Sequence, residues 1–223
     1  MDAVYLYKHT NSDELVYSVR LLKKFYPSVG VIYIVGDRPP AALDGQVVHI
    51  QHRAPLGKFV DQMMKFALIV RLQYLSDQFI LMMDDVYLTA PFTPQVLYDR
   101  KYPTLADKIK SRADDPYRKS LMKTGKYLIE NDMSDTNYEL HVPVVIEKQK
   151  AIFVTNNIVD TDFDLQIKSL YFNFYNPLDG QTSVPYDDVK NIKIEDVNAY
   201  LSTSNVKFEK YRKFLDQLLW MNL

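Results

Sequence analysis

The first 90 residues alternate between short apolar runs and amphipathic runs, and this alternation constrains the fold more than any other feature. Apolar, β-branched and aromatic residues predict strands at 3–8, 29–35, 47–50 and 79–83. Between them, apolar residues at three- and four-residue spacing predict two helices, one from the capping pair Asn11 and Glu14 to Pro27 and one at 58–74. Strands that alternate with helices form parallel sheets with helices on both faces. We therefore expect an α/β, Rossmann-like fold with a mostly parallel central sheet.

The second half of the chain is less regular and predicts a more helical structure. Polar helices are expected within 93–130, a strand at 140–147, and further helices at 165–175 and 206–220. Because no linker rich in Gly, Pro or Ser divides the chain, we expect a single domain over 1–223 with halves 1–92 and 93–223.

Composition excludes several classes of protein. Hydrophobic residues make up 47% and charged residues 25%, as in ordinary globular proteins, and no Cys is present. The lack of Cys excludes disulfides, thiolate zinc sites and cysteine nucleophiles. The N-terminus lacks the pattern of a signal peptide and no apolar run is long enough to span a bilayer, so we expect a cytoplasmic protein.

The strongest local signal is the pair Asp84 and Asp85, which follows the apolar run 79–83 directly. A buried parallel strand that ends in two carboxylates places both at the carboxyl edge of the sheet, where open α/β sheets bind ligands. Adjacent carboxylates repel each other unless a cation lies between them, and hard oxygen ligands suit Mg²⁺ or Mn²⁺. The alternative is structural: Asp84 caps the next turn and Asp85 is solvated.

Three other residues could contribute to the same site. Asp37 ends the second predicted strand and could accept hydrogen bonds from a ribose or base, or could only open the turn that follows. His141 could be a further metal ligand if the chain folds back over the paired acids; a lone His is more often structural. Lys65 could present the polar edge of its helix to a ligand, or lie on a solvated face.

The sequence lacks the motifs of several other enzyme classes. No G-x-x-x-x-G-K-[ST] or G-x-G-x-x-G follows a strand, no His pair has zincin spacing, and no G-x-S-x-G is present. A haloacid-type phosphatase would place its two Asp residues two positions apart on an early strand, whereas Asp84 and Asp85 are adjacent.

A basic stretch lies between residues 100 and 126, with nine Lys or Arg and three Asp. It is interpreted either as a solvated helical face or as a surface that receives an anionic acceptor, such as a lipid phosphate, an acidic glycan or nucleic acid.

Several segments together resemble the Stealth-type sugar-phosphate transferases. The second conserved block of that family is similar to 13–20, 25–27, 31–39 and 75–91, and its third block, with a His and a Pro, is similar to 137–143 followed by Lys148. The resemblance implies transfer of hexose-1-phosphate from a nucleotide sugar. The family's first block ends in an acidic motif, whereas Lys8, His9 and Thr10 stand here, and Met83 replaces the Asn that precedes its paired acids.

These differences favour a second resemblance, to the compact GT-A-type nucleotide-sugar glycosyltransferases of bacteria and phages. It implies that Asp84 and Asp85 form the catalytic centre, with Asp85 and His141 as ligands of Mn²⁺ or Mg²⁺. Lys8, Asp37 and Lys65 would line the site of a UDP-type donor.

In this view 1–92 is the nucleotide-sugar-binding half and 93–223 the acceptor-side half. The acceptor could be a glycan, a polymer or a modified DNA base, and the carboxylate that would serve as a base is open between Asp114, Asp115, Glu139 and none of them. The alternative from another class is a nucleotide-binding domain without catalytic activity.

Overall fold

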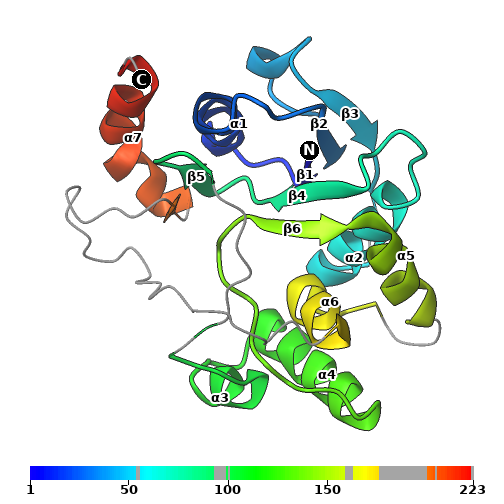
Figure 1. The fold of residues 1–223 in the computed structure, drawn as a ribbon. Helices are drawn as coiled ribbons and strands as arrows, with labels where there is room; N and C mark the ends of the chain where they lie inside the picture. Colours follow the sequence, from blue (N-terminus) through cyan, green and yellow to red (C-terminus); the bar gives the residue numbers. More distant parts are fainter. Residues whose placement is uncertain are drawn as a thin grey trace.

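A five-stranded sheet forms the centre of the computed structural model (Figure 1), which describes residues 1–53, 56–92, 99, 101–158, 163–175, 200–203 and 205–221. The strands lie in the order β3-β2-β1-β4-β6. Their bounds are β1 Asp2–Tyr7, β2 Ile32–Gly36, β3 Val48–Gln51, β4 Gln78–Met82 and β6 Val144–Glu147. β1 to β4 are parallel to one another, and β6 pairs antiparallel with β4. The predicted α/β class with a mostly parallel sheet is confirmed.

Helices cover both faces of the sheet because successive side chains of a strand point to opposite faces. On one face, Ala3, Tyr5 and Tyr7 of β1 pack in a core with α1 (Glu14–Phe25) and α7 (Asn205–Trp220). On the other face, Val4 packs in a second core with the remaining helices. These are α2 (Lys58–Ile69), α3 (Leu105–Lys110), α4 (Pro116–Glu130), α5 (Lys148–Asn157) and α6 (Ile167–Tyr175).

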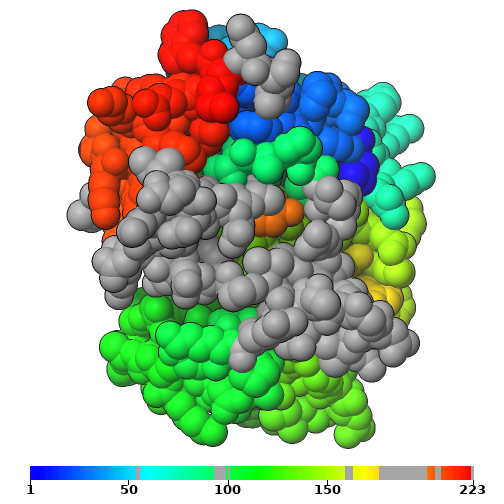
Figure 2. Space-filling view, turned by 60° about the vertical axis from the view of Figure 1, so that its left-hand side comes forward, coloured from blue at the N-terminus to red at the C-terminus, as the bar shows by residue number. Residues whose placement is uncertain are grey.

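A second, two-stranded sheet joins distant parts of the chain. β5 (Val86–Leu88) pairs antiparallel with β7 (Tyr200–Ser202), and α7, which follows β7, contacts α1. Figure 2 shows α7 (red to orange) beside α1 (blue) in the upper part of the molecule, with α3 and α4 (green) in the lower part. The C-terminal segment is thereby fixed beside the end of β4.

The structure differs from the sequence-based expectation in several elements. β5, β7, α5 and a short 3₁₀ helix at Ala41–Leu43 were not predicted. The predicted capping pair of Asn11 and Glu14 is wrong: α1 begins at Glu14, and its N-cap Asp13 makes no side-chain capping bond. Glu14 is instead buried, and its carboxylate accepts a hydrogen bond from Ser12 (2.8 Å).

Within the described part of the chain, none of the helices has the length and apolar character needed to cross a membrane. The predicted helices within 93–130 correspond to α3 and α4, and residues 93–98 and 100 lie outside the described residues.

Candidate functional site

The order of the strands reverses between β1 and β4. From β1 the chain runs outward to β2 and β3, and it then returns to the other side of β1 to form β4. α1, which follows β1, and β5, which follows β4, lie on the same face of the sheet and contact each other, so the loops after β1 and β4 come close together there. Such a reversal in strand order is where open α/β sheets bind their ligands. Asp84 and Asp85 follow β4 at this point.

Asp84 and Asp85 occupy the centre of a tight turn between β4 and β5. The backbone N–H of Val86 donates to the carbonyl oxygen of Met83 (3.2 Å) and closes the turn. Ser18 of α1 fixes the turn from outside, because its hydroxyl donates to the carbonyl oxygen of Val86 (2.5 Å). The two acids therefore project from a backbone that is anchored to the first helix.

Three carboxylates share this part of the molecule. Burial, together with the negative charges of Asp85 and Glu14, raises the pKa of Asp84 to about 7. The pKa of Glu14 is also raised, mainly by burial and in smaller part by the charge of Asp85, although hydrogen bonds from Ser12 and Thr203 oppose the increase. Among the described residues, the buried Oδ1 of Asp85 has no hydrogen-bond partner. Burial and mutual repulsion thus disfavour the ionised forms of Asp84 and Glu14.

His141 lies against Asp85, as the sequence-based hypothesis required. Its Nδ1 is 3.3 Å from Oδ2 of Asp85 and 3.3 Å from the hydroxyl oxygen of Ser202. Thr203 completes this side of the site, since its N–H donates to the carbonyl oxygen of Asp85 (3.0 Å) and its hydroxyl donates to Glu14 (3.1 Å). In the described ranges no cluster of three or more His, Cys, Asp or Glu residues could by itself hold a metal ion, and the role of His141 as a ligand stays a prediction.

Two of the predicted donor-site residues, Lys8 and Asp37, follow the carboxyl ends of β1 and β2. Lys8 is exposed directly after β1, and Asp37 follows β2, where its carboxylate accepts a hydrogen bond from the N–H of His9 (2.9 Å). Asp37 also lines an open hollow of about 610 Å³. Other side chains around this hollow are Arg38, His49, Gln51, His52 and Arg53.

Lys65 is buried, and its contacts are internal. Its ammonium forms an ion pair with Asp61 (2.6 Å) and donates to the carbonyl oxygen of Tyr7 (2.8 Å). These bonds attach α2 to the end of β1. The structure therefore gives Lys65 a supporting position at the end of β1, and direct contact with a donor stays a prediction.

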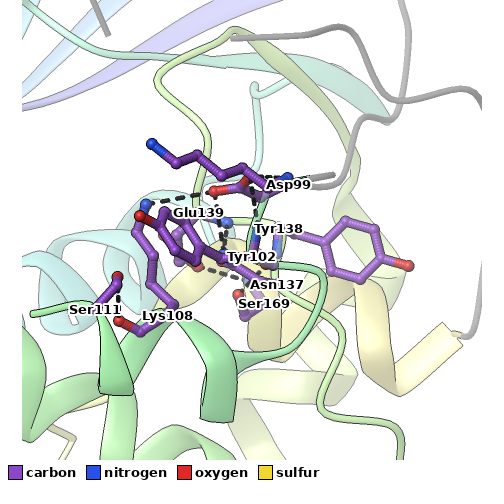
Figure 3. A network of polar contacts seen from close by, with 9 residues as sticks. Asp99, Tyr102, Lys108, Ser111, Asn137, Tyr138, Glu139 and Ser169 are labelled. Carbon is purple, nitrogen blue, oxygen red and sulfur yellow. Dashed lines mark hydrogen bonds and ion pairs between the residues drawn. The ribbon is translucent and has the colours of Figure 1, made fainter. Parts of the chain in front are cut away.

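A network of polar contacts holds the segment that leads to His141. The Asp99 carboxylate accepts backbone N–H groups of Lys101 (2.9 Å) and Tyr102 (3.1 Å) and pairs with Lys108 (3.3 Å) (Figure 3). The side-chain amide of Asn137 donates to the carbonyl oxygen of Tyr102 (2.9 Å) and accepts the N–H of Glu139 (3.1 Å). Glu139 therefore lies two residues before His141 in a fixed segment.

The basic stretch is largely neutralised by acidic neighbours. Six of its nine basic residues form ion pairs, namely Lys108–Asp99, Lys110–Asp107, Arg112–Asp115, Arg118–Asp114, Lys123–Asp164 and Lys126–Glu130. These pairs take up Asp114 and Asp115, two of the three carboxylates that the sequence offered as a base. The contacts favour a solvated helical face; an anionic acceptor stays a prediction.

Sequence reasoning missed four residues at the site: Glu14, Lys168, Ser202 and Thr203. Glu14 looked like a capping residue; Ser202 ends, and Thr203 follows, a three-residue strand that has no signal of its own. Lys168 could have been noticed as the one charged residue of the helix 167–175. Its position beside the site depends on how α6 packs.

No family model matches the sequence. A search of curated proteins likewise finds no match. The conclusions about function therefore depend on the fold and on the contacts described above.

Proposed function

We propose that this chain is a metal-dependent glycosyltransferase that moves a sugar from a UDP-type nucleotide sugar to an acceptor hydroxyl. The observation that carries the proposal is the turn of Asp84 and Asp85 at the strand-order reversal, with His141 held against Asp85. The strand order, with the four parallel strands β3-β2-β1-β4 and an antiparallel β6 at the edge, supports a GT-A-like fold.

The residues present fit a divalent cation bound together with a diphosphate. Asp85 has one buried oxygen without a protein partner among the described residues, and the charges of Asp85 and Glu14 help to raise the pKa of Asp84. Mg²⁺ and Mn²⁺ commonly take one or two protein carboxylates and complete their coordination with substrate phosphates and water. Asp85 and His141 would hold the cation, and Asp84 would add negative charge beside it. When bound, the cation would stabilise the charge that develops on the departing diphosphate.

The nucleoside would bind in the hollow that Asp37 lines. The hollow beside Asp37 has a volume of about 610 Å³, which lies within the range of small-molecule sites, roughly 300–1,000 Å³. Asp37 would accept a hydrogen bond from the ribose or base, and Lys8 would contact the diphosphate between the hollow and Asp85. In the reaction, the acceptor oxygen bonds to the anomeric carbon, the bond from that carbon to the diphosphate oxygen breaks, and the proton of the acceptor hydroxyl passes to a base or to water.

The test combines ligand binding with a matched pair of variants. Nucleoside mono- and diphosphates and nucleotide sugars are screened by thermal unfolding, each with and without Mn²⁺. A ligand at a hundred times its dissociation constant stabilises a protein by about 2.7 kcal/mol, a clearly visible shift. We expect a Mn²⁺-dependent shift with a uridine diphosphate, lost in Asp85→Asn and retained in the exposed control Asp77→Asn.

The released nucleotide separates the alternatives. Sugar transfer releases nucleoside diphosphate, whereas hexose-1-phosphate transfer breaks the bond between the two phosphates and releases nucleoside monophosphate. Metal-dependent binding without turnover would support the nucleotide-binding domain without activity. No shift with any nucleotide would refute the donor site altogether.

A further inference from the structure

Lys168 is a buried lysine that the proposed function does not use. It is the second residue of α6 and is 6% exposed. Its ammonium donates to the carbonyl oxygens of Leu140 and Val142 (3.3 Å to the latter) and lies 3.6 Å from the sulfur of Met83. Burial of an ammonium costs several kcal/mol, so these contacts compensate an unfavourable placement.

These contacts join the two segments that form the candidate site. Leu140 and Val142 stand on either side of His141, and Met83 immediately precedes Asp84. One ammonium therefore binds the backbone on both sides of His141 and touches the residue before the paired acids. His141 is the residue that lies 3.3 Å from Asp85.

Two carboxylates, those of Glu139 and Asp85, influence the pKa of Lys168. Burial lowers the pKa of Lys168, and the negative charges of Glu139 and Asp85 oppose the decrease. Glu139 is itself held by α6, because its carboxylate accepts the backbone N–H of Ser169 (2.7 Å); Figure 3 shows both residues. The positive charge thus lies near one carboxylate from each of the two segments.

We propose that Lys168 is a positioning residue: it holds the 140–142 turn so that the imidazole of His141 stays against Asp85. The proposal deepens the proposed function and depends on it only where metal binding is concerned. The contact between His141 and Asp85 exists without any ligand, so it can be tested independently.

The chain offers a matched control for removal of the ammonium. Lys148 is also buried, at 8% exposure, and its ammonium also donates to two backbone carbonyls, those of Gln73 (3.2 Å) and Leu75 (3.1 Å). Those carbonyls belong to the connection between α2 and β4, not to the His141 turn. Lys168→Met and Lys148→Met therefore remove the same kind of group, and only the first should affect the site.

The first readout is the coupling between Asp85 and His141, measured by the ¹⁵N resonances of the His141 ring. The sequence has four His, and His141→Asn assigns the signal. Spectra are taken at about pH 8, where an ordinary imidazole is neutral. We expect Asp85→Asn to shift the His141 resonances in the wild-type and Lys148→Met backgrounds and to leave them unchanged in Lys168→Met. Equal shifts in all three backgrounds would overturn the proposal.

If Lys168→Met does not fold, Lys168→Gln replaces it. The Gln amide can donate to only part of the turn, so the shift caused by Asp85→Asn should be reduced but not abolished. A full shift in this variant contradicts the positioning role.

The second readout is Mn²⁺ affinity by titration calorimetry, which separates positioning from simple charge. Removal of a positive charge near Asp85 would by itself strengthen Mn²⁺ binding. Loss of positioning would weaken Mn²⁺ binding. We expect the Mn²⁺ affinity of Lys168→Met to fall about 10- to 100-fold, as for other residues that orient metal ligands. Tighter binding would refute the proposal. If wild type binds Mn²⁺ neither alone nor together with uridine diphosphate, the proposed function fails, and the resonance experiment alone decides the role of Lys168.

Discussion

At the scale of single residues, Gly36 shows how closely the end of β2 packs against Tyr7 of β1 and Lys65 of α2. Its φ is +132°, and an added Cβ would lie 2.0 Å from the carbonyl oxygen of Tyr7 and 2.7 Å from the ammonium of Lys65. We predict that Gly36→Ala destabilises the protein by at least about 1–3 kcal/mol from backbone strain alone. Urea unfolding measures the loss. Gly45→Ala is the control, because Gly45 also has a positive φ (+70°) but has no atom within 4 Å of an added Cβ; an equal loss in both variants would contradict the packing argument.

Asp84 makes stability depend on pH. Its pKa is raised from 3.8 to about 7 in the folded protein, so the folded state binds a proton more tightly than the unfolded chain. Stability therefore falls as the pH rises from about 4 to about 7 and stays reduced above that range. We predict that Asp84→Asn is more stable than wild type at about pH 8 by on the order of a few kcal/mol, since one pKa unit corresponds to about 1.4 kcal/mol.

The difference between Asp84→Asn and wild type should become small near pH 4, because Asp84 is then protonated in the folded protein and roughly 40% protonated in the unfolded chain, where its pKa is 3.8. Urea unfolding of both proteins across this pH range measures it. Asp77→Asn, at an exposed Asp, should show no such pattern. A stability difference that does not vary with pH would argue against a buried, repelled Asp84 carboxylate.

At the scale of elements, α7 supports the site from outside. Phe208 of α7 is fully buried between Tyr17 of α1 (ring centroids 5.3 Å apart) and Tyr87 of β5 (6.2 Å). We predict that Phe208→Ala costs about 3–5 kcal/mol, as for other buried aromatic residues. Because β7 precedes α7 closely, the variant should also weaken the contacts of Ser202 and Thr203 with the site and lower Mn²⁺ affinity.

The control for this helix is Trp220, which lies at the end of α7 and is 85% exposed. Trp220→Ala should change the free energy of unfolding by less than about 0.5 kcal/mol. Thermal and urea unfolding compare the two variants, and similar losses in both would mean that α7 does not dock through Phe208.

The elements also show what local sequence can predict. β1, β2 and β4 are short apolar runs, and α1 and α2 carry a periodic apolar pattern, so their order and the carboxyl-edge position of Asp84 followed from the sequence alone. β5 and β7 are three residues each and exist because segments more than a hundred residues apart pair with each other. Glu14 and Lys168 reach the site only through such packing, and no spacing in the chain indicates it.

At the scale of the whole molecule, the two halves expected from the sequence share one framework. β4 of the first half pairs with β6 of the second, β5 pairs with β7, and α1 contacts α7. Apolar residues of both halves belong to each of the two cores, one on each face of the sheet. Neither half can therefore bury its apolar surface alone.

We predict that residues 1–223 unfold in a single cooperative transition. Scanning calorimetry should give a ratio of calorimetric to van't Hoff enthalpy of about 1, as for two-state domains. The isolated segment 1–92 should not fold, because β4 would lose β6 and the face of the sheet that packs with α1 would lose α7. A dispersed amide NMR spectrum for that segment, or two separate calorimetric transitions in the full chain, would show that the halves are independent. Cooperative unfolding would mean that changes in the C-terminal helices reach Asp84 and Asp85 through the shared sheet and its two cores.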